Sequence, residues 1–241
     1  MADKAALVTG ASSGIGLGIA RVLTESGYAL TISSRRPEKL AAAAAELRGL
    51  GGTVHEAPAD LSTEEGVIGV VASHREEYGR LDLLVNNAGM GIGGPVETLQ
   101  AKHIDLQLAL NLKATFFFYR EAVPMLREAA AESGRALVIN VSSMTGKRGH
   151  PDISVYSATK HGIVGFTQAM EVELSGDGIT SCALCPGYVD TELADYKKGE
   201  LPAEEMITVE DVASSVRFLV GLSPTCAVPE IIFAKPGELS Y

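Results

Sequence analysis

Two side chains able to exchange protons, Tyr156 and Lys160, lie four residues apart in the stretch SVYSATK. If this stretch is helical, both side chains rise from one face, one turn from each other. An ammonium group at that distance favours tyrosinate and lowers the pKa of the phenol from its ordinary value of about 10. Such a tyrosine can act as a general acid or base near neutral pH. Because the same spacing also occurs between ordinary surface residues of helices, other residues must decide between the two interpretations.

A glycine-rich turn near the N-terminus supplies a second chemical signal. Gly10, Gly14 and Gly16 follow an apolar run, residues 4–9, and precede a helical run, residues 17–26. Glycines allow a tight turn and the close approach of a ligand, and the N-terminus of the following helix attracts a pyrophosphate. The sequence therefore predicts a dinucleotide site, to which we assign Gly10, Ser12, Ser13, Gly14, Ile15 and Gly16. A glycine turn needed only for packing is the alternative.

The elements that must position these residues alternate between strands and helices. Short apolar runs predict seven strands, at residues 4–9, 29–33, 53–57, 81–85, 135–141, 179–184 and 228–233. Helical stretches separate them, and Pro124 is expected to kink or divide the longest, residues 99–131. This order is typical of an α/β fold of the Rossmann type, a doubly wound parallel sheet of about seven strands with helices on both faces. No break in composition divides the chain, so we expect one domain over residues 1–241.

Composition and charge argue against several classes of protein. The chain carries a formal net charge of −10 and no run rich in lysine or arginine, which argues against nucleic-acid binding. No stretch reaches about 18 consecutive apolar residues, so we expect no membrane span and no membrane partner. Three cysteines are too few for a disulfide scaffold, and the N-terminus lacks the pattern of a signal peptide, so we expect a cytoplasmic protein. Cys182 and Cys185 are expected to be buried structural thiols, and no metal site is expected.

Five short motifs together resemble the short-chain dehydrogenase/reductase family over nearly the whole chain. They are the turn TGxxxGIG at residues 9–16, NNAG at residues 86–89, Asn111, Ser143 with Tyr156 and Lys160, and PGxVxT at residues 186–191. Ser143 lies thirteen residues before Tyr156, which is the usual separation in that family. Each motif alone is weak, but their order and spacing agree.

The resemblance implies hydride transfer between nicotinamide and a carbonyl or alcohol carbon. It makes Tyr156 the general acid or base, with Lys160 lowering its pKa and also holding the nicotinamide ribose. It implies that Ser143 donates a hydrogen bond to the substrate oxygen. It also implies that Asn111 positions a water molecule that links Lys160 to solvent. Ser142 is the adjacent alternative to Ser143. Since the two side chains point in opposite directions, at most one should face the site.

The resemblance also extends the cofactor site beyond the glycine turn. It implies contacts to the adenine side from Asp60 and Leu61, although a loop acid or a helix cap would also account for Asp60. The other implied cofactor contacts are Asn87, Ala88, Gly89, Tyr156, Lys160, Pro186, Gly187, Val189 and Thr191.

The residues after the second strand indicate which cofactor is preferred. Enzymes that prefer NAD usually carry a carboxylate there, which accepts from the ribose hydroxyls, whereas this chain reads SSRRP at residues 33–37. A guanidinium suits the 2′-phosphate of NADP, so we expect Arg35, assisted by Arg36, to favour NADP(H) over NAD(H). Ser13 stands where some relatives that prefer NADP have a second basic residue, which weakens this preference.

The sequence thus predicts an NADP(H)-dependent oxidoreductase that acts on a small carbonyl compound or secondary alcohol. Two alternatives stay open: an NAD-dependent alcohol or hydroxyacyl dehydrogenase, and a dinucleotide-binding redox sensor without turnover. A short polar segment, residues 190–206, is expected to cover the substrate. The long helix is apolar on more than one face, which core packing alone could explain. Because members of the resembled family commonly pair this helix with its twin in a second subunit, the resemblance implies a homodimer or homotetramer. His150 and His161, which flank the active-site helix, are interpreted as packing or surface residues.

Overall fold

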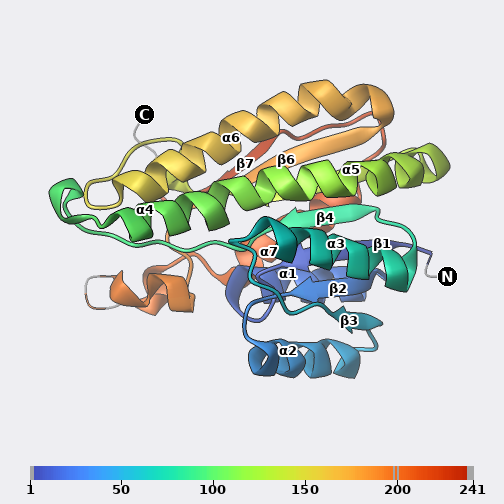
Figure 1. Cartoon of the computed structure of the whole chain (residues 1–241), viewed down its shortest axis with the longest axis horizontal. Helices are drawn as coiled ribbons and strands as arrows, with labels where there is room; N and C mark the ends of the chain where they lie inside the picture. Colours follow the sequence, from blue (N-terminus) through green and yellow to red (C-terminus); the bar gives the residue numbers. More distant parts are fainter. Residues whose placement is uncertain (1–2, 198, 200, 238–241) are drawn as a thin grey trace.

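The computed structural model describes residues 3–197, 199 and 201–237 (Figure 1). Its centre is a seven-stranded sheet in the order β3-β2-β1-β4-β5-β6-β7, in which every neighbouring pair is parallel. The strands are β1 Ala5–Thr9, β2 Ala29–Ser33, β3 Val54–Glu56, β4 Leu83–Asn86, β5 Ala136–Val141, β6 Ile179–Pro186 and β7 Glu230–Phe233. The strand order reverses between β1 and β4, which is where doubly wound sheets bind ligands. The predicted fold class is confirmed.

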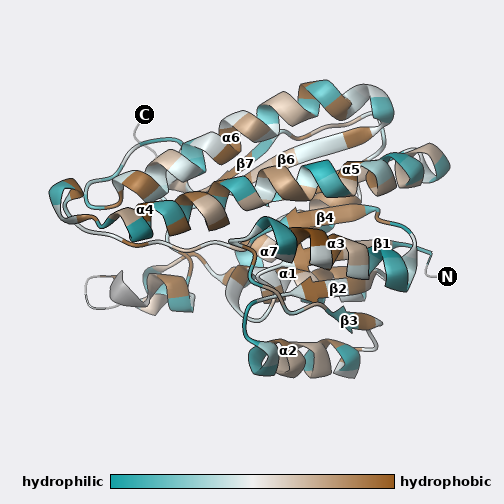
Figure 2. Cartoon of the chain, in the orientation of Figure 1, coloured by the Kyte–Doolittle hydropathy of each residue, from teal (hydrophilic) through white to brown (hydrophobic). Residues whose placement is uncertain are grey.

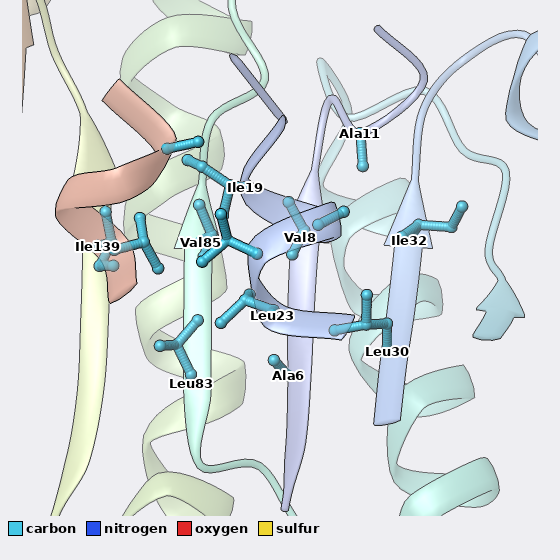
Figure 3. Packing of buried hydrophobic residues seen from close by; sticks show 14 of the residues in the cluster. Ala6, Val8, Ala11, Ile19, Leu23, Leu30, Ile32, Leu83, Val85 and Ile139 are labelled. Carbon is cyan, nitrogen blue, oxygen red and sulfur yellow. The ribbon is translucent and has the colours of Figure 1, made fainter. Parts of the chain in front are cut away.

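Helices cover both faces of the sheet. They are α1 Gly14–Glu25, α2 Pro37–Gly49, α3 Glu64–Tyr78, α4 Ala101–Leu108, α5 Ala114–Ser133, α6 Ser154–Leu174 and α7 Val209–Val220. On one face α1, α2 and α7 share a core cluster, and Figure 3 shows its side chains Ile19 and Leu23 of α1 beside Val8 and Val85 of the sheet. On the other face α3, α5 and α6 form a second cluster around Phe118. Each helix therefore buries one stripe and exposes the other.

The residue types of the strands explain their position in the sheet. Every residue of β1, β2, β4, β5 and β6 is buried, as expected for continuous apolar runs covered on both faces. The edge strand β7 is only partly buried along its length. Figure 2 accordingly shows hydrophobic colour along β2 and β4 and mixed colour along the surrounding helices.

The long helical stretch is interrupted at a different place from the one predicted. A π-helical turn, Ala109–Lys113, separates α4 from α5 and contains Asn111. Pro124 lies inside α5 and does not divide it, so the predicted division of the helix at this residue is wrong. Pro124 is exposed, and on that side water can hydrate the Arg120 carbonyl that a proline cannot bond.

The segment predicted to cover the substrate contains two 3₁₀ turns, Glu192–Lys197 and Ala203–Glu205. A parallel bridge between Val189 and Ile207 closes its base. Residues 198 and 200 of this segment lie outside the described part of the chain.

Two cysteines of β6, Cys182 and Cys185, are buried and unpaired. They belong to different hydrophobic clusters, as expected for side chains on opposite faces of a strand. Burial raises the pKa of each thiol to about 12, so neither is a reactive thiolate near neutral pH. In the described ranges, no group of three or more His, Cys, Asp or Glu side chains could hold a metal ion. No helix in those ranges combines the length and apolar character needed to cross a membrane.

Candidate active site

A cavity of about 480 Å³ opens where the carboxyl ends of β1, β4, β5 and β6 meet. Residues from four separate stretches of the chain reach it: the glycine turn, the NNAG turn, the loop and helix after β5, and the segment after β6. The predicted site residues that line it are Ile15, Asn87, Gly89, Ser143, Tyr156, Lys160, Pro186, Gly187, Val189 and Thr191. Parallel topology alone gathers these residues, since it directs all the strand ends to one edge of the sheet.

Tyr156 and Lys160 lie one turn apart on α6, as the spacing predicts. The Nζ atom of Lys160 is 5.5 Å from the centroid of the Tyr156 ring. Lys160 is only 4% exposed, and its Nζ donates to the carbonyl oxygen of Val141 at 2.9 Å. Burial lowers the pKa of Lys160 to about 8. The ammonium is therefore held in a poorly solvated place beside the phenol, where its charge acts strongly.

The two adjacent serines after β5 have different surroundings. Ser142 is 3% exposed, and its Oγ donates to the carbonyl oxygen of Lys160 at 2.9 Å. Both serines line the cavity, which contradicts the expectation that at most one would face it. The Ser143 Oγ accepts from the backbone N–H of Thr145 at 3.1 Å. Because that oxygen accepts, the hydroxyl hydrogen of Ser143 stays available for a substrate oxygen. The geometry therefore favours Ser143 over Ser142 as the residue that meets substrate.

Asn111 ties the π turn to the chain after the NNAG motif. Its Oδ1 accepts from the Met90 N–H, and its Nδ2 donates to the Met90 carbonyl oxygen, both at 2.8 Å. Gly89 lies between Asn111 and Lys160, since a Cβ placed on it would be 3.3 Å from Oδ1 and 3.5 Å from Nζ. Asn111 is thus close to Lys160, and single π turns often occur at functional sites. The water link stays a prediction.

The glycine turn packs directly against the NNAG turn. The side-chain Nδ2 of Asn87 donates to the carbonyl oxygens of Thr9 and Gly10, at 2.9 and 3.2 Å. A Cβ on Gly16 would lie 2.4 Å from that amide nitrogen. Gly10 and Gly14 have φ angles of 65° and 54°, which favour glycine. The contact between the two turns and the backbone conformation therefore already require glycine at positions 10, 14 and 16, without any ligand.

Thr9 joins the two turns but is not among the residues predicted for the site. Its Oγ1 accepts from the backbone N–H groups of Asn87 and Ala88, at 2.9 and 3.0 Å, and donates to the Val85 carbonyl. Its position directly before Gly10 is the signal that could have found it. Ser13 has an extended backbone, and no side chain caps α1, so the N–H groups of its first turn remain available to a ligand.

Of the two residues predicted to contact the adenine, Asp60 is exposed and Leu61 is buried. Asp60 is exposed and accepts from the backbone N–H and the hydroxyl of Ser62, at 3.0 and 2.7 Å. These hydrogen bonds lower the pKa of Asp60, and the charge of Arg35 acts in the same direction. Thr63, rather than Asp60, caps α3. Leu61 is 4% exposed and packs in the core.

Basic side chains gather at the end of β2, as predicted. Arg35 and Arg36 are both exposed. Arg36 lies 3.7 Å from a carboxylate oxygen of Glu192, and Lys39 donates to the same carboxylate at 2.8 Å. Glu192 belongs to the covering segment, so an ion pair joins that segment to the basic cluster.

Comparison with known proteins decides the family. Residues 4–201 match the sequence profile described as short chain dehydrogenase. This protein belongs to that family. The resemblance seen in its motifs is thereby confirmed, and the chain is an oxidoreductase of a family that acts on hydroxyl and keto groups.

Individual relatives agree with this assignment. The D-beta-hydroxybutyrate dehydrogenase of Rhizobium meliloti is 33% identical, over 90% of this chain and 92% of that protein. A variant of actinorhodin polyketide ketoreductase, solved with NADPH, has a TM-score of 0.88 and 32% identity over 98% of both chains. The 3-ketoacyl-(acyl-carrier-protein) reductase of Brucella melitensis, solved with NADH, has a TM-score of 0.87 and 27% identity over 98% of both chains.

The cavity of this short-chain dehydrogenase also includes residues that sequence reasoning missed. Tyr188 occupies an unspecified position of the PGxVxT motif, and Leu193 with Ala194 comes from the covering segment. The motif and the predicted covering segment include these residues but do not single them out, because only the folded chain brings them to the cavity. His150, interpreted as a packing or surface residue, is exposed and also lines the cavity. His161 is exposed, and its Nδ1 lies 2.9 Å from the Ser157 carbonyl oxygen.

Proposed function

We propose that this short-chain dehydrogenase is an NADP(H)-dependent oxidoreductase that reduces a carbonyl group, or oxidises the corresponding secondary alcohol, of a small molecule. The observation that carries the proposal is the meeting of Ser143, Tyr156 and Lys160 in one cavity beside the glycine turn. When bound, the nicotinamide cofactor supplies or accepts the hydride. The protein must then orient the substrate oxygen and move one proton.

Three side chains divide that work. The Tyr156 hydroxyl gives its proton to the oxygen of the reduced carbonyl, as a general acid. The buried Lys160 ammonium stabilises the tyrosinate that remains. Ser143 donates its free hydroxyl hydrogen to the same substrate oxygen and so stabilises the charge that develops there. In the proposed relay, Lys160 then passes a proton to the tyrosinate, and a water positioned by Asn111 returns a proton from solvent to Lys160.

The preference for NADP(H) rests on the end of β2. The hydroxyls of Ser33 and Ser34 are buried and make no hydrogen bond within the described residues, so a polar ligand group would satisfy them. Arg35 follows directly, and the residues from Ser33 to Pro37 include no acid. Arg35 and Arg36 would hold the 2′-phosphate. That phosphate would replace the Glu192 carboxylate on Arg36.

Steady-state kinetics with a panel of ketones tests the chemistry and the cofactor separately. Tyr156→Phe is expected to lower kcat by about 100-fold to 10,000-fold while NADPH still binds. Arg35→Ala is expected to raise the KM for NADPH much more than the KM for NADH. Equal effects on the two cofactors would contradict the proposed preference, and full activity of Tyr156→Phe would contradict the proposed chemistry.

The same site supports a second function, an NAD-dependent alcohol or hydroxyacyl dehydrogenase. The observation that favours it is the solved relative that contains NADH. Faster alcohol oxidation with NAD⁺ than with NADP⁺ would select this function. A redox sensor without turnover would bind NADPH tightly and reduce no member of the ketone panel.

We also propose that the protein is cytoplasmic and forms a homodimer or homotetramer. Its single domain, residues 1–241, would bind both cofactor and substrate. Three unpaired cysteines suit a reducing compartment. The exposed apolar side chains Phe116 on α5 and Val172 on α6, 37% and 80% exposed, suit an interface between copies. Light scattering should show a smaller assembly for Val172→Glu than for Phe218→Glu on α7.

A further inference from the structure

Arg148 brings a positive charge to the cavity. It lies in the loop between β5 and α6, five residues after Ser143, and lines the same cavity. Most arginines of this chain hold a carboxylate, as Arg21 holds Glu46. The Arg148 guanidinium makes no hydrogen bond or ion pair within the described residues. Although exposed arginines are often unpaired, this one lies at the cavity that holds Ser143 and Tyr156.

Within the described part of the chain, the cavity lining offers no negative side chain to balance that charge. Among the described residues, none of those lining it is Asp or Glu, although the whole chain carries a net charge of −10. The neighbouring Lys147 is different, because its Nζ donates to Glu230 on β7 at 2.9 Å. Arg148 therefore adds its charge to that of Lys160 in a cavity whose described lining lacks carboxylates, and such a cavity attracts anions.

Backbone contacts hold Arg148 at a defined place relative to Ser143. The Gly146 N–H donates to the Ser143 carbonyl at 2.8 Å, and the Arg148 N–H donates to the Met144 carbonyl at 3.2 Å. This turn also packs tightly on α6, since a Cβ on Gly146 would lie 2.7 Å from the Lys160 carbonyl oxygen. The backbone that carries the Arg148 side chain is therefore fixed to the same turn as Ser143.

His150 adds a second polar group to the lining of the cavity. Its Nδ1 lies 2.9 Å from the Pro151 carbonyl oxygen. A carbonyl can only accept, so Nδ1 carries a hydrogen. Nε2 has no hydrogen-bond partner within residues 3–197, 199 and 201–237. It is available to a ligand that Arg148 holds.

We propose that the substrate is an oxo compound with an anionic group, a carboxylate or a phosphate, and that Arg148 binds this group while the carbonyl oxygen lies at Ser143 and Tyr156. The inference rests on the proposed function of the cavity. A guanidinium matches both anions through paired N–H donors. Arg148 is thereby a residue that determines substrate specificity, and it takes no part in proton transfer.

Matched substrate pairs test this inference. The probes are 3-oxobutanoate, 4-oxopentanoate and 5-oxohexanoate against their methyl esters, and dihydroxyacetone phosphate against dihydroxyacetone. In the wild type we expect higher kcat/KM for at least one anion than for its neutral partner. Because charge-assisted hydrogen bonds from a guanidinium to an anion are strong, Arg148→Ala should lower kcat/KM for that anion about 10-fold to 100-fold. The neutral partner should change less than about twofold. The substrate pair with the larger preference for the anion shows whether the site binds a carboxylate or a phosphate.

Two variants of the same loop serve as controls. Arg148→Lys should recover part of the loss, and Lys147→Ala should leave the preference for the anion unchanged. Equal losses for anion and neutral partner in Arg148→Ala, or no loss for either, would overturn the proposal while leaving the reductase function intact.

A binding measurement separates failure of the proposal from failure of the proposed function. Calorimetry with the NADP⁺-loaded protein compares pentanoate with pentanamide and propyl phosphate with propanol. We expect one anion to bind the wild type at least about tenfold more tightly than it binds Arg148→Ala. If no ketone is reduced but this difference is present, only the reductase function fails. If neither anion binds, or both proteins bind them equally, the anion site is refuted.

Discussion

Lowering the pH from about 8 to about 5 is predicted to destabilise the fold through one buried imidazole, that of His74 on α3. His74 is fully buried, and its Nε2 lies 2.9 Å from the Arg80 carbonyl oxygen. That oxygen can only accept, so Nε2 carries the hydrogen and Nδ1 accepts from the Thr31 hydroxyl at 2.7 Å. The neutral ring thus uses both nitrogens. Burial lowers its pKa to about 4, although the Arg80 carbonyl and the charge of Asp82 favour the protonated form.

The sign and size of the effect follow from the two states. In the unfolded chain a histidine has a pKa of about 6.5, whereas His74 in the folded protein has a pKa of about 4. Between these values the unfolded chain binds a proton that the folded protein does not, so the free energy of unfolding falls as the pH falls. At about 1.36 kcal/mol per pH unit, the loss is about 2 kcal/mol at pH 5 and about 3 kcal/mol below pH 4.

Urea unfolding at fixed protein concentration measures this loss in the wild type and in His74→Gln. Glutamine does not titrate, so the variant should lose about 2 kcal/mol less than the wild type between about pH 8 and pH 5. The matched control is His55→Gln, because the His55 side chain is 28% exposed and bonds to Ser73. We expect this control to retain most of the wild-type pH dependence. Parallel declines of the wild type and His74→Gln would refute the reasoning.

Three further predictions concern the site. Gly16→Ala places a Cβ 2.4 Å from the side-chain amide nitrogen of Asn87, so it should lower the free energy of unfolding in urea by about 1–3 kcal/mol. The control is Gly69→Ala in α3, where a Cβ meets open space, and it should raise the free energy of unfolding by about 0.5–1 kcal/mol. Ser143→Ala should lower kcat at least about 100-fold with little change in stability, and Ser142→Ala should cost about 1 kcal/mol with most activity kept; the reverse pattern would move the role to Ser142. Because burial lowers the pKa of Lys160 to about 8, kcat/KM for reduction should fall as the pH rises through about 8. A flat profile up to about pH 10 would contradict this role.

Much of the fold could be predicted because the strands are buried on both faces. The sequence predicts β2 at residues 29–33, and the strand is observed as Ala29–Ser33, since a continuous apolar run between two turns is typical of a buried strand. For β6 the predicted end is residue 184, but the strand extends to Pro186. Its last pairing, Pro186 with Phe233 of β7, depends on a strand more than forty residues away. Local patterns cannot show where such a pairing ends.

The interruption of the long helix could not be predicted from local rules. Pro124 is the obvious helix breaker, yet it lies on the exposed side of α5, where the lost hydrogen bond is tolerated. The π turn occurs at Asn111, whose side chain binds the backbone of Met90, twenty-one residues earlier. A contact across the fold thus overrides the local preference for a regular helix.

The candidate site shows the same division. Tyr156 and Lys160 follow from helical spacing, and Ser143 follows from a motif separation, so all three could be predicted. Arg148 and Tyr188 could not, because their role depends on which side of a loop faces the cavity.

The glycine turn shows how one motif can satisfy two requirements. The sequence assigns Gly16 to the close approach of a ligand, but the Asn87 amide already fills the space where a side chain would be. Gly14 faces Thr191 of the segment after β6, because a Cβ placed on Gly14 would lie 3.1 Å from the Thr191 Cγ2. The glycines therefore let two loops from different strands meet, and this meeting brings the first turn of α1 to the cavity. A dinucleotide could bind at the first turn of α1 only if these loops pack in this way. The glycines can therefore serve both the packing of the loops and the binding of a ligand.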